Sequence, residues 1–127
     1  MTSAGLKSDE HFQVANFSAE MEGHLARLRE KFLASLVERV LSFEEMKRVL
    51  RSDRNSAAAL QTIYDLAHKI SGVAATLGFA DVGALSSEME HRISGGRAKA
   101  NSVDDIFCDT LPVLEDLLDE MERLLDS

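Results

Sequence analysis

The stretch that decides the fold of this chain covers residues 57–77 and reads AAALQTIYDLAHKISGVAATL. At about 100° per residue, its apolar residues fall into one band, which predicts an amphipathic helix with a single buried face. The band consists of Leu60, Ile63, Ala67, Ile70, Ala74 and Leu77. Ser56 is suited to be the N-cap, and Gly78 stands where a glycine commonly follows a helix, so both ends of the helix are indicated.

The segments on either side repeat the helical pattern. One helix is expected from about Ser18 to Ser52 and another over residues 80–93, ended by the triplet Ser94-Gly95-Gly96. Residues 97–101 form a polar connector, and a last helix is expected over residues 102–125, with Ser102 and Asp105 as a capping box. Pro112 lies inside this last pattern, where it either kinks the helix or marks its start.

Each of these helices has an apolar stripe that predicts its buried face. The stripe of the first helix contains Leu25, Leu28, Phe32, Leu36, Val40, Phe43 and Leu50, widened by Leu33, Val37, Met46 and Val49. The third contains Val82, Leu85, Met89 and Ile93, and the last contains Ile106, Val113, Leu114, Leu117, Leu118, Met121 and Leu125. No run alternates as a strand would. The sequence therefore predicts an all-α, antiparallel four-helix bundle over residues 17–127, preceded by a flexible or partly helical N-terminal tail over residues 1–16.

The composition limits the class of protein. The chain has 127 residues, 22 Asp and Glu against 14 Lys and Arg, and a net charge of −8. This acidic balance disfavours nucleic acid and anionic membranes as partners, because both require clustered basic residues. No stretch reaches the roughly 18 to 20 apolar residues of a membrane span. The one cysteine, Cys108, cannot form an internal disulfide and is expected to be a small buried residue. We therefore expect a cytoplasmic protein, and a monomer, because four helices complete one bundle.

One residue in the stretch 57–77 points to chemistry. His68 lies well over 100° from the centre of the apolar band, so it is expected to face solvent. Four residues later stands Gly72, although a glycine inside a helix costs about 1 kcal/mol relative to alanine. Because helical side chains lean toward the N-terminus, Gly72, with the small Ser71 and Ala75, leaves the imidazole uncovered.

An exposed imidazole is a nucleophile near neutral pH, so His68 is a candidate to accept and release a phosphoryl group. Lys69 is an adjacent cation that would favour the phosphorylated state. The alternative is that His68 has no role and that Gly72 marks close helix packing.

The segment Ala67-His-Lys-Ile-Ser-Gly-Val-Ala-Ala-Thr-Leu-Gly-Phe79 resembles the signature of histidine-containing phosphotransfer (HPt) domains. His68, Ile70, Gly72, Leu77 and Gly78 match that signature in register, and Met89-Glu90 matches a pair expected in the next helix. The resemblance implies a four-helix bundle with an exposed phosphoacceptor histidine. It also implies a phosphorelay, in which Nε2 takes a phosphoryl group from one receiver domain and passes it to the aspartate of another.

The resemblance further implies a phosphocarrier without kinase activity of its own. A receiver domain and a hybrid sensor kinase are the partners, and the Mg²⁺ is held by the receiver, so no cofactor or metal is expected in this chain. The lysine usual three positions after the histidine is Ser71 here, whereas Lys69 lies about 160° away around the helix. Glu90 either accepts a hydrogen bond from Nδ1–H of His68, which leaves Nε2 to attack, or is a solvated acid.

The remaining candidates concern docking and metal binding. A patch beside His68 is expected to receive the partner; it contains Gln61, Tyr64, Asp65, Val73 and Phe79. Glu88-Met-Glu-His91 resembles one half of a di-iron motif, but a second copy is absent, and His11, His24 and His91 have no metal-site spacing. The main alternative function is a helical adaptor that binds a partner without phosphotransfer. A sensor-kinase dimerisation domain is disfavoured, because its His-Glu motif and following proline are missing.

Overall fold

The computed structural model describes the backbone of residues 2–127 and the side chains of residues 18–127. Its elements are four helices, α1 (Thr2–Ser52), α2 (Ala57–Ala74), α3 (Ala80–Ala98) and α4 (Val103–Asp126), and this part of the chain contains no strand. The predicted all-α class is therefore confirmed. The chain divides into two compact units, Met1–Phe32 and Leu33–Ser127. The first unit is the N-terminal part of α1, and the second contains the rest of α1 with the other helices.

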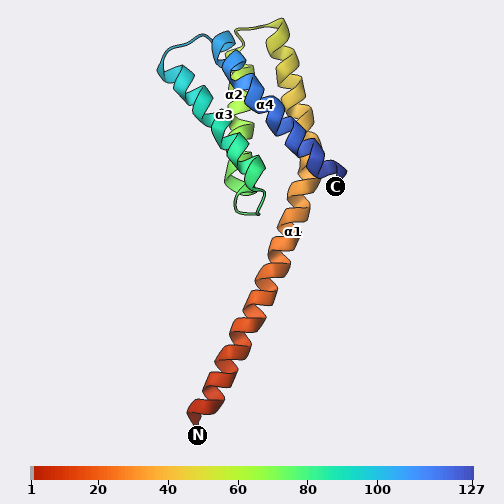
Figure 1. Cartoon of the computed structure of the whole chain (residues 1–127), viewed down its shortest axis with the longest axis vertical. Helices are drawn as coiled ribbons and strands as arrows, with labels where there is room; N and C mark the ends of the chain where they lie inside the picture. Colours follow the sequence, from red (N-terminus) through yellow and green to blue (C-terminus); the bar gives the residue numbers. More distant parts are fainter. Residues whose placement is uncertain (1) are drawn as a thin grey trace. The chain divides into compact units, whose positions relative to one another are not determined.

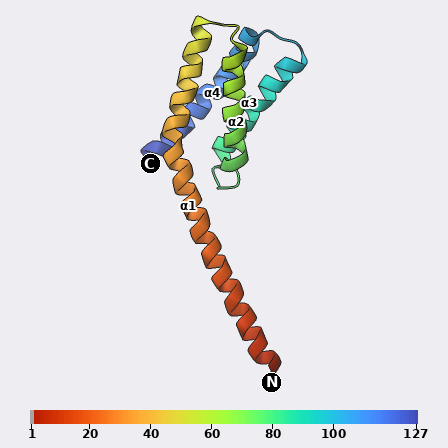
Figure 2. The same cartoon turned by 180° about the vertical axis from the view of Figure 1, so that it is seen from behind.

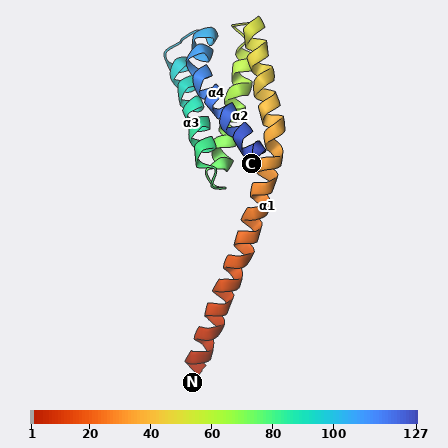
Figure 3. The same cartoon turned by 45° about the vertical axis from the view of Figure 1, so that its right-hand side comes forward.

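The second unit is an antiparallel four-helix bundle. In Figure 1 the yellow end of α1 lies alongside α2 and α4, with α3 on the opposite side of the bundle, and the views from behind and from the side agree (Figures 2 and 3). The α1–α2 and α3–α4 connections lie at one end of the bundle, and the α2–α3 connection lies at the other. This up-and-down order follows from the short connections, which force consecutive helices to reverse direction.

The core of the second unit is formed by the predicted stripes. The fully buried large side chains include Leu36, Phe43 and Leu50 from α1, Leu60, Ile63 and Ile70 from α2, Val82, Met89 and Ile93 from α3, and Leu114, Leu117 and Met121 from α4. Two exceptions are Val37 and Leu125, which are exposed although their stripes predicted burial. Both lie at the margin of a stripe, where the helix surface turns toward solvent.

Polar side chains enter this core at three points. Lys47 of α1 is 4% exposed, and its Nζ lies 2.5 Å from Oε1 of Glu115 on α4 and 3.5 Å from Glu44, so its charge is paired. Thr110 donates a hydrogen bond to the carbonyl oxygen of Ile106, 2.8 Å away. The Oγ of Ser86, by contrast, is buried without a hydrogen-bond partner in the described part of the chain.

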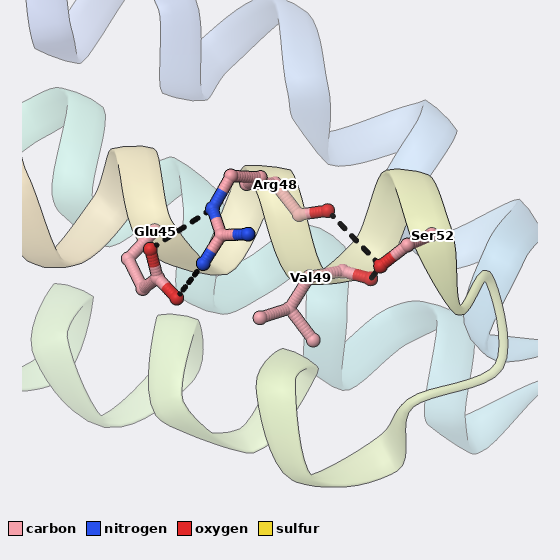
Figure 4. Close-up of polar contacts among 4 residues, drawn as sticks. All are labelled: Glu45, Arg48, Val49 and Ser52. Carbon is pink, nitrogen blue, oxygen red and sulfur yellow. Dashed lines mark hydrogen bonds and ion pairs between the residues drawn. The ribbon is translucent and has the colours of Figure 1, made fainter.

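The C-terminal end of α1 has its own polar contacts, shown in Figure 4. The Arg48 guanidinium forms two hydrogen bonds with the Glu45 carboxylate one turn earlier, which raises the pKa of Arg48 above its ordinary value. The hydroxyl of Ser52 donates to the carbonyl oxygen of Val49 at 3.1 Å, and the Asp53 N–H donates to the same oxygen at 2.8 Å. These bonds satisfy carbonyl groups that the end of a helix leaves without partners.

Helix α2 begins at Ala57, as its sequence predicted, and ends at Ala74, three residues before the predicted end at Leu77. The Ser56 side chain caps its N-terminus by accepting a hydrogen bond from the Ala59 N–H, 3.2 Å away. After Ala74 the chain closes a Schellman motif, in which the Phe79 N–H donates to the Ala74 carbonyl and the Gly78 N–H to the Ala75 carbonyl. Gly78 has φ 89°, the left-handed conformation that this motif requires and that glycine adopts without strain.

Helix α3 is longer than predicted, since it continues through Gly95 and Gly96 to Ala98. The expectation that these glycines end the helix was wrong. A Cβ atom at position 96 would lie 2.5 Å from Cγ1 of Ile106 on α4, so Gly96 allows the close approach of two helices. The helix ends instead in a second Schellman motif, in which Asn101 and Ala100 donate to the carbonyls of Gly96 and Arg97. Its left-handed residue is Ala100, with φ 57°.

Three other expectations need correction. Helix α1 begins at Thr2 and not near Ser18, because a helix does not require an amphipathic period, which is the only signal that residues 1–16 lack. The domain boundary between residues 16 and 17 stays a prediction. Helix α4 runs through Pro112, which therefore does not mark its start. Cys108 is exposed and not buried, because its neighbour Phe107 takes the inward-facing position of that turn.

Candidate functional site

His68 stands on the outer face of α2. Its immediate neighbour Ala67 is fully buried, as are Ile63 and Ile70, so the core face of the helix is fixed and His68 is turned outward. The His68 side chain is 71% exposed. The bundle thus presents this imidazole to solvent from a rigid element that is anchored through its opposite face.

The two nitrogens of His68 have different surroundings. Nδ1 lies 2.8 Å from Oε1 of Glu90, on α3, so of the two alternatives for Glu90 the structure shows the hydrogen bond to the ring. Since an ionised carboxylate can only accept, Nδ1 carries the proton in this pair, and in a neutral imidazole Nε2 then has the free lone pair. Among the described residues no hydrogen bond to Nε2 is present.

Ser71 adds a second contact to the same carboxylate. Its Oγ lies 3.2 Å from Oε1 of Glu90 and 3.0 Å from the carbonyl oxygen of His68. One hydroxyl hydrogen serves one of these acceptors at a time. When it is donated to Glu90, it holds the carboxylate oxygen that faces the ring. Ser71, at the position of the usual lysine, therefore contributes a hydrogen bond and no positive charge.

Gly72 has open space around it. A Cβ atom built at this position would meet nothing within 4 Å, so close helix packing does not account for the glycine. The close approach of α2 and α3 occurs at Ala75, whose backbone nitrogen would lie 3.3 Å from a Cβ at Gly83. Gly72 and Ala75 are nevertheless both exposed, which leaves the surface on the C-terminal side of His68 flat. Lys69 is exposed on α2, and no contact between it and the His68 ring is present.

The expected docking residues lie around this surface. Gln61 donates a hydrogen bond to Asp65, 2.9 Å away, and both are exposed. The Tyr64 ring is half-buried and stacks on the His68 ring with a centroid distance of 6.3 Å and an interplanar angle of 4°. Val73 is 42% exposed, whereas Phe79 is half-buried at the start of α3, with its N–H donated to the Ala74 carbonyl.

Arg97 is a member of this neighbourhood that the sequence pattern does not indicate. The sequence predicts a polar connector at this position, but Arg97 lies in the last turn of α3, and its guanidinium carbon is 5.4 Å from the centroid of the Tyr64 ring. The charge of an arginine at this distance from an aromatic face is attracted by the ring quadrupole. The contact between Gly96 and Ile106 explains why α3 continues past the two glycines. Because it joins two helices, the sequence alone does not reveal it.

Metal ligands do not gather around His68. Over the residues with described side chains, no cluster of three or more His, Cys, Asp or Glu side chains has the proximity of a metal site. His24 and His91 are exposed, and His11 lies outside the described side chains. A search of the same residues for membrane-spanning segments finds no helix that is both long and apolar enough.

Comparison with known protein families gives one match, the Hpt domain, over residues 14–126. This match covers most of the chain, and the chain belongs to the Hpt domain family. Membership implies involvement in a phosphorelay, where Hpt domains interact with receiver domains and kinases. Searches of curated proteins and of solved structures found no match.

Proposed function

We propose that this chain is a phosphorelay intermediate that carries a phosphoryl group on Nε2 of His68. The donor is the aspartyl phosphate of a receiver domain, phosphorylated within a hybrid sensor kinase, and the acceptor is the aspartate of another response regulator. The observation that carries the proposal is the exposed imidazole whose Nδ1 is bonded to Glu90 and whose Nε2 has no hydrogen-bond partner among the described residues.

The transfer is a displacement at phosphorus. The Nε2 lone pair attacks the phosphorus atom, the bond between phosphorus and the aspartyl oxygen breaks, and the aspartate leaves as a carboxylate with that electron pair. The ring gains positive charge as the N–P bond forms, and the Glu90 carboxylate at Nδ1–H offsets this charge. In the second transfer the carboxylate of the next receiver attacks the same phosphorus, and Nε2 leaves with its lone pair restored.

The chain supplies the nucleophile and its orientation, and the receiver supplies the rest. Mg²⁺ and its acidic ligands belong to the receiver domain, so we assign no cofactor to this chain. The flat surface formed by Gly72 and Ala75 allows the receiver's phosphoryl group to approach the ring. We further propose that the protein acts in the cytoplasm as a monomer, in keeping with a single exposed cysteine and one complete bundle.

The test is phosphorylation of the purified full chain by phosphoramidate, a donor that needs no partner, and by a panel of phosphorylated receiver domains. Intact mass measures the addition of one phosphoryl group, and acid treatment should remove it, as expected for a phosphoramidate bond. His68→Gln should abolish labelling, whereas His91→Gln, which changes another exposed histidine, should leave it intact.

A folded chain, as judged by circular dichroism, that no donor labels would overturn the proposal. The helical adaptor, which binds a partner without phosphotransfer, would then be the function to pursue. Labelling that persists in His68→Gln would equally contradict the assignment of His68 as the phosphoacceptor.

A further inference from the structure

Three planar groups follow one another across the α2–α3 surface. The guanidinium of Arg97 lies 5.4 Å from the centroid of the Tyr64 ring, and the Tyr64 ring lies parallel to the His68 ring at 6.3 Å. Tyr64 thus connects a cation at the end of α3 with the imidazole in the middle of α2. The sequence separation between Tyr64 and Arg97 shows that this arrangement is produced by the packing of the two helices.

The charge of Arg97 is not neutralised by a carboxylate. Arg97 is exposed, and no ion pair with an Asp or Glu within 4.0 Å is present for it among the described residues. By contrast, Arg48, Arg92 and Arg123 all pair with a glutamate on their own helix. In a chain of net charge −8, an arginine held on an aromatic ring without an anionic partner is available to an external anion.

The position of Arg97 favours a protein carboxylate over the phosphoryl group as that anion. Tyr64 is in contact with both Arg97 and His68, whereas no hydrogen bond or ring contact between the Arg97 guanidinium and His68 is present among the described residues. Attraction between Arg97 and a phosphoryl group on His68 acts at an exposed surface, where water and salt screen charges that are not in contact. A carboxylate on a partner that covers the whole surface would, however, meet the guanidinium directly.

We propose that Tyr64 and Arg97 form a docking pair for an acidic side chain on the receiver domain, next to the receiver's phosphorylated aspartate. The Tyr64 ring holds the guanidinium by its face and leaves the N–H edges for two parallel hydrogen bonds to a carboxylate. The charge is complementary, since Arg97 is a cation without a carboxylate partner among the described residues. This inference rests on the proposed function, but it assigns receiver affinity to a group separate from the phosphoacceptor.

The test separates docking from chemistry. The donor is the phosphorylated receiver domain, chosen from the panel above, that labels the wild-type chain. The rate of phosphotransfer to the full chain is measured as a function of the concentration of this receiver. Arg97→Ala should raise the receiver concentration for half-maximal rate about tenfold, as expected for the loss of one charged contact, with the rate at saturation retained. Labelling by phosphoramidate, which requires no docking, should keep its rate.

Two further variants sharpen the result. Lys99→Ala removes one positive charge from the same end of α3, two residues after Arg97. It should leave the receiver concentration for half-maximal rate unchanged. Arg97→Lys keeps the charge and loses the planar edge, so its effect should be intermediate. Combining Tyr64→Leu with Arg97→Ala should weaken docking less than the product of the two single effects, because the two residues act as a pair.

Two outcomes would overturn the docking role. In the first, Arg97→Ala leaves the half-maximal receiver concentration unchanged while His68 is still labelled by both donors. In the second, Arg97→Ala slows phosphoramidate labelling as strongly as receiver transfer, which would assign Arg97 to the reactivity of the ring. Failure of the proposed function is distinguishable from both, since the wild-type chain would then take label from neither donor.

Discussion

The surroundings of the His68 ring assign different tasks to its two nitrogens. Glu90 binds Nδ1 from α3, and Ser71 binds the same carboxylate oxygen from α2, so the orientation of the ring is set by two helices. Ser71, with a hydroxyl, stands at the position of the usual lysine. A cation is present instead at Arg97, which contacts the Tyr64 ring that stacks on His68. Orientation and positive charge, which one lysine can combine, are thus divided between separate residues in this chain.

Removal of the Glu90 carboxylate tests this division. Glu90→Ala should slow phosphoramidate labelling of His68 about tenfold, because a charge-assisted hydrogen bond of roughly 1.5 kcal/mol no longer supports the ring as it becomes positive. Glu90→Gln retains an acceptor oxygen without charge and should slow labelling less. The measurement is the initial rate by intact mass, with Glu88→Ala, which removes an exposed carboxylate of α3 that pairs with Arg92, as the control. If Glu90→Ala is labelled at the wild-type rate, the contact between Glu90 and His68 is an ordinary surface pair that does not support the reaction.

The ends of the helices determine what the site contains. The turn after α2 contains a glycine in the left-handed conformation, Gly78, whereas α3 passes two glycines and the turn after it contains an alanine in that conformation, Ala100. The difference arises because Gly96 is needed for contact with Ile106 and cannot also end the helix. The additional turn of α3 is what carries Arg97 to the Tyr64 ring.

Exchange of the two terminating residues should have opposite effects on stability. A left-handed alanine costs about 1–2 kcal/mol. Glycine removes this strain, but it also gives the unfolded chain more conformational freedom, which offsets part of the gain in stability. Ala100→Gly should therefore raise the free energy of unfolding by roughly 0.5–1 kcal/mol, and Gly78→Ala should lower it by about 1 kcal/mol. Urea titration followed by circular dichroism measures both. A destabilised Ala100→Gly would show that the Ala100 side chain makes a contribution larger than its strain.

At the scale of the whole molecule, the site belongs to the unit Leu33–Ser127, which contains the three helices α2, α3 and α4 entire. The fully buried large residues of this unit begin at Leu36. The family match begins at residue 14. His68, the residues that surround it and the fully buried large side chains therefore all belong to this one unit.

Deletion of residues 1–16 should accordingly leave both stability and labelling unchanged. The free energy of unfolding should stay within about 0.5 kcal/mol of the full chain, because the sequence predicts that the bundle begins at residue 17. The rate of phosphoramidate labelling of His68 should be the same. Deletion through Leu36 is the matched comparison and should destabilise the bundle, because it removes a fully buried side chain. A large loss of stability in the shorter deletion would place the domain boundary before residue 17.

The sequence by itself determined the features that depend on neighbouring residues. The apolar periods located the four helices, the band from Leu60 to Leu77 fixed which face of α2 is buried, and the outward direction of His68 followed from that band. Ser56, Gly78 and Ser102 were recognisable as helix ends because capping depends on residues within one turn. Most of the HPt signature is local for the same reason, since it lies within the short stretch Ala67–Phe79.

The tertiary structure decided everything that depends on contact between helices. Whether Glu90 meets Nδ1 or stays in solvent depends on the rotation of α3 against α2, which periodicity defines only to within part of a turn. The role of Gly96 depends on Ile106 of α4, and the place of Arg97 depends in turn on Gly96. Distances of a few ångströms between residues far apart in sequence are set by the packing of side chains in the core, and no local pattern encodes them.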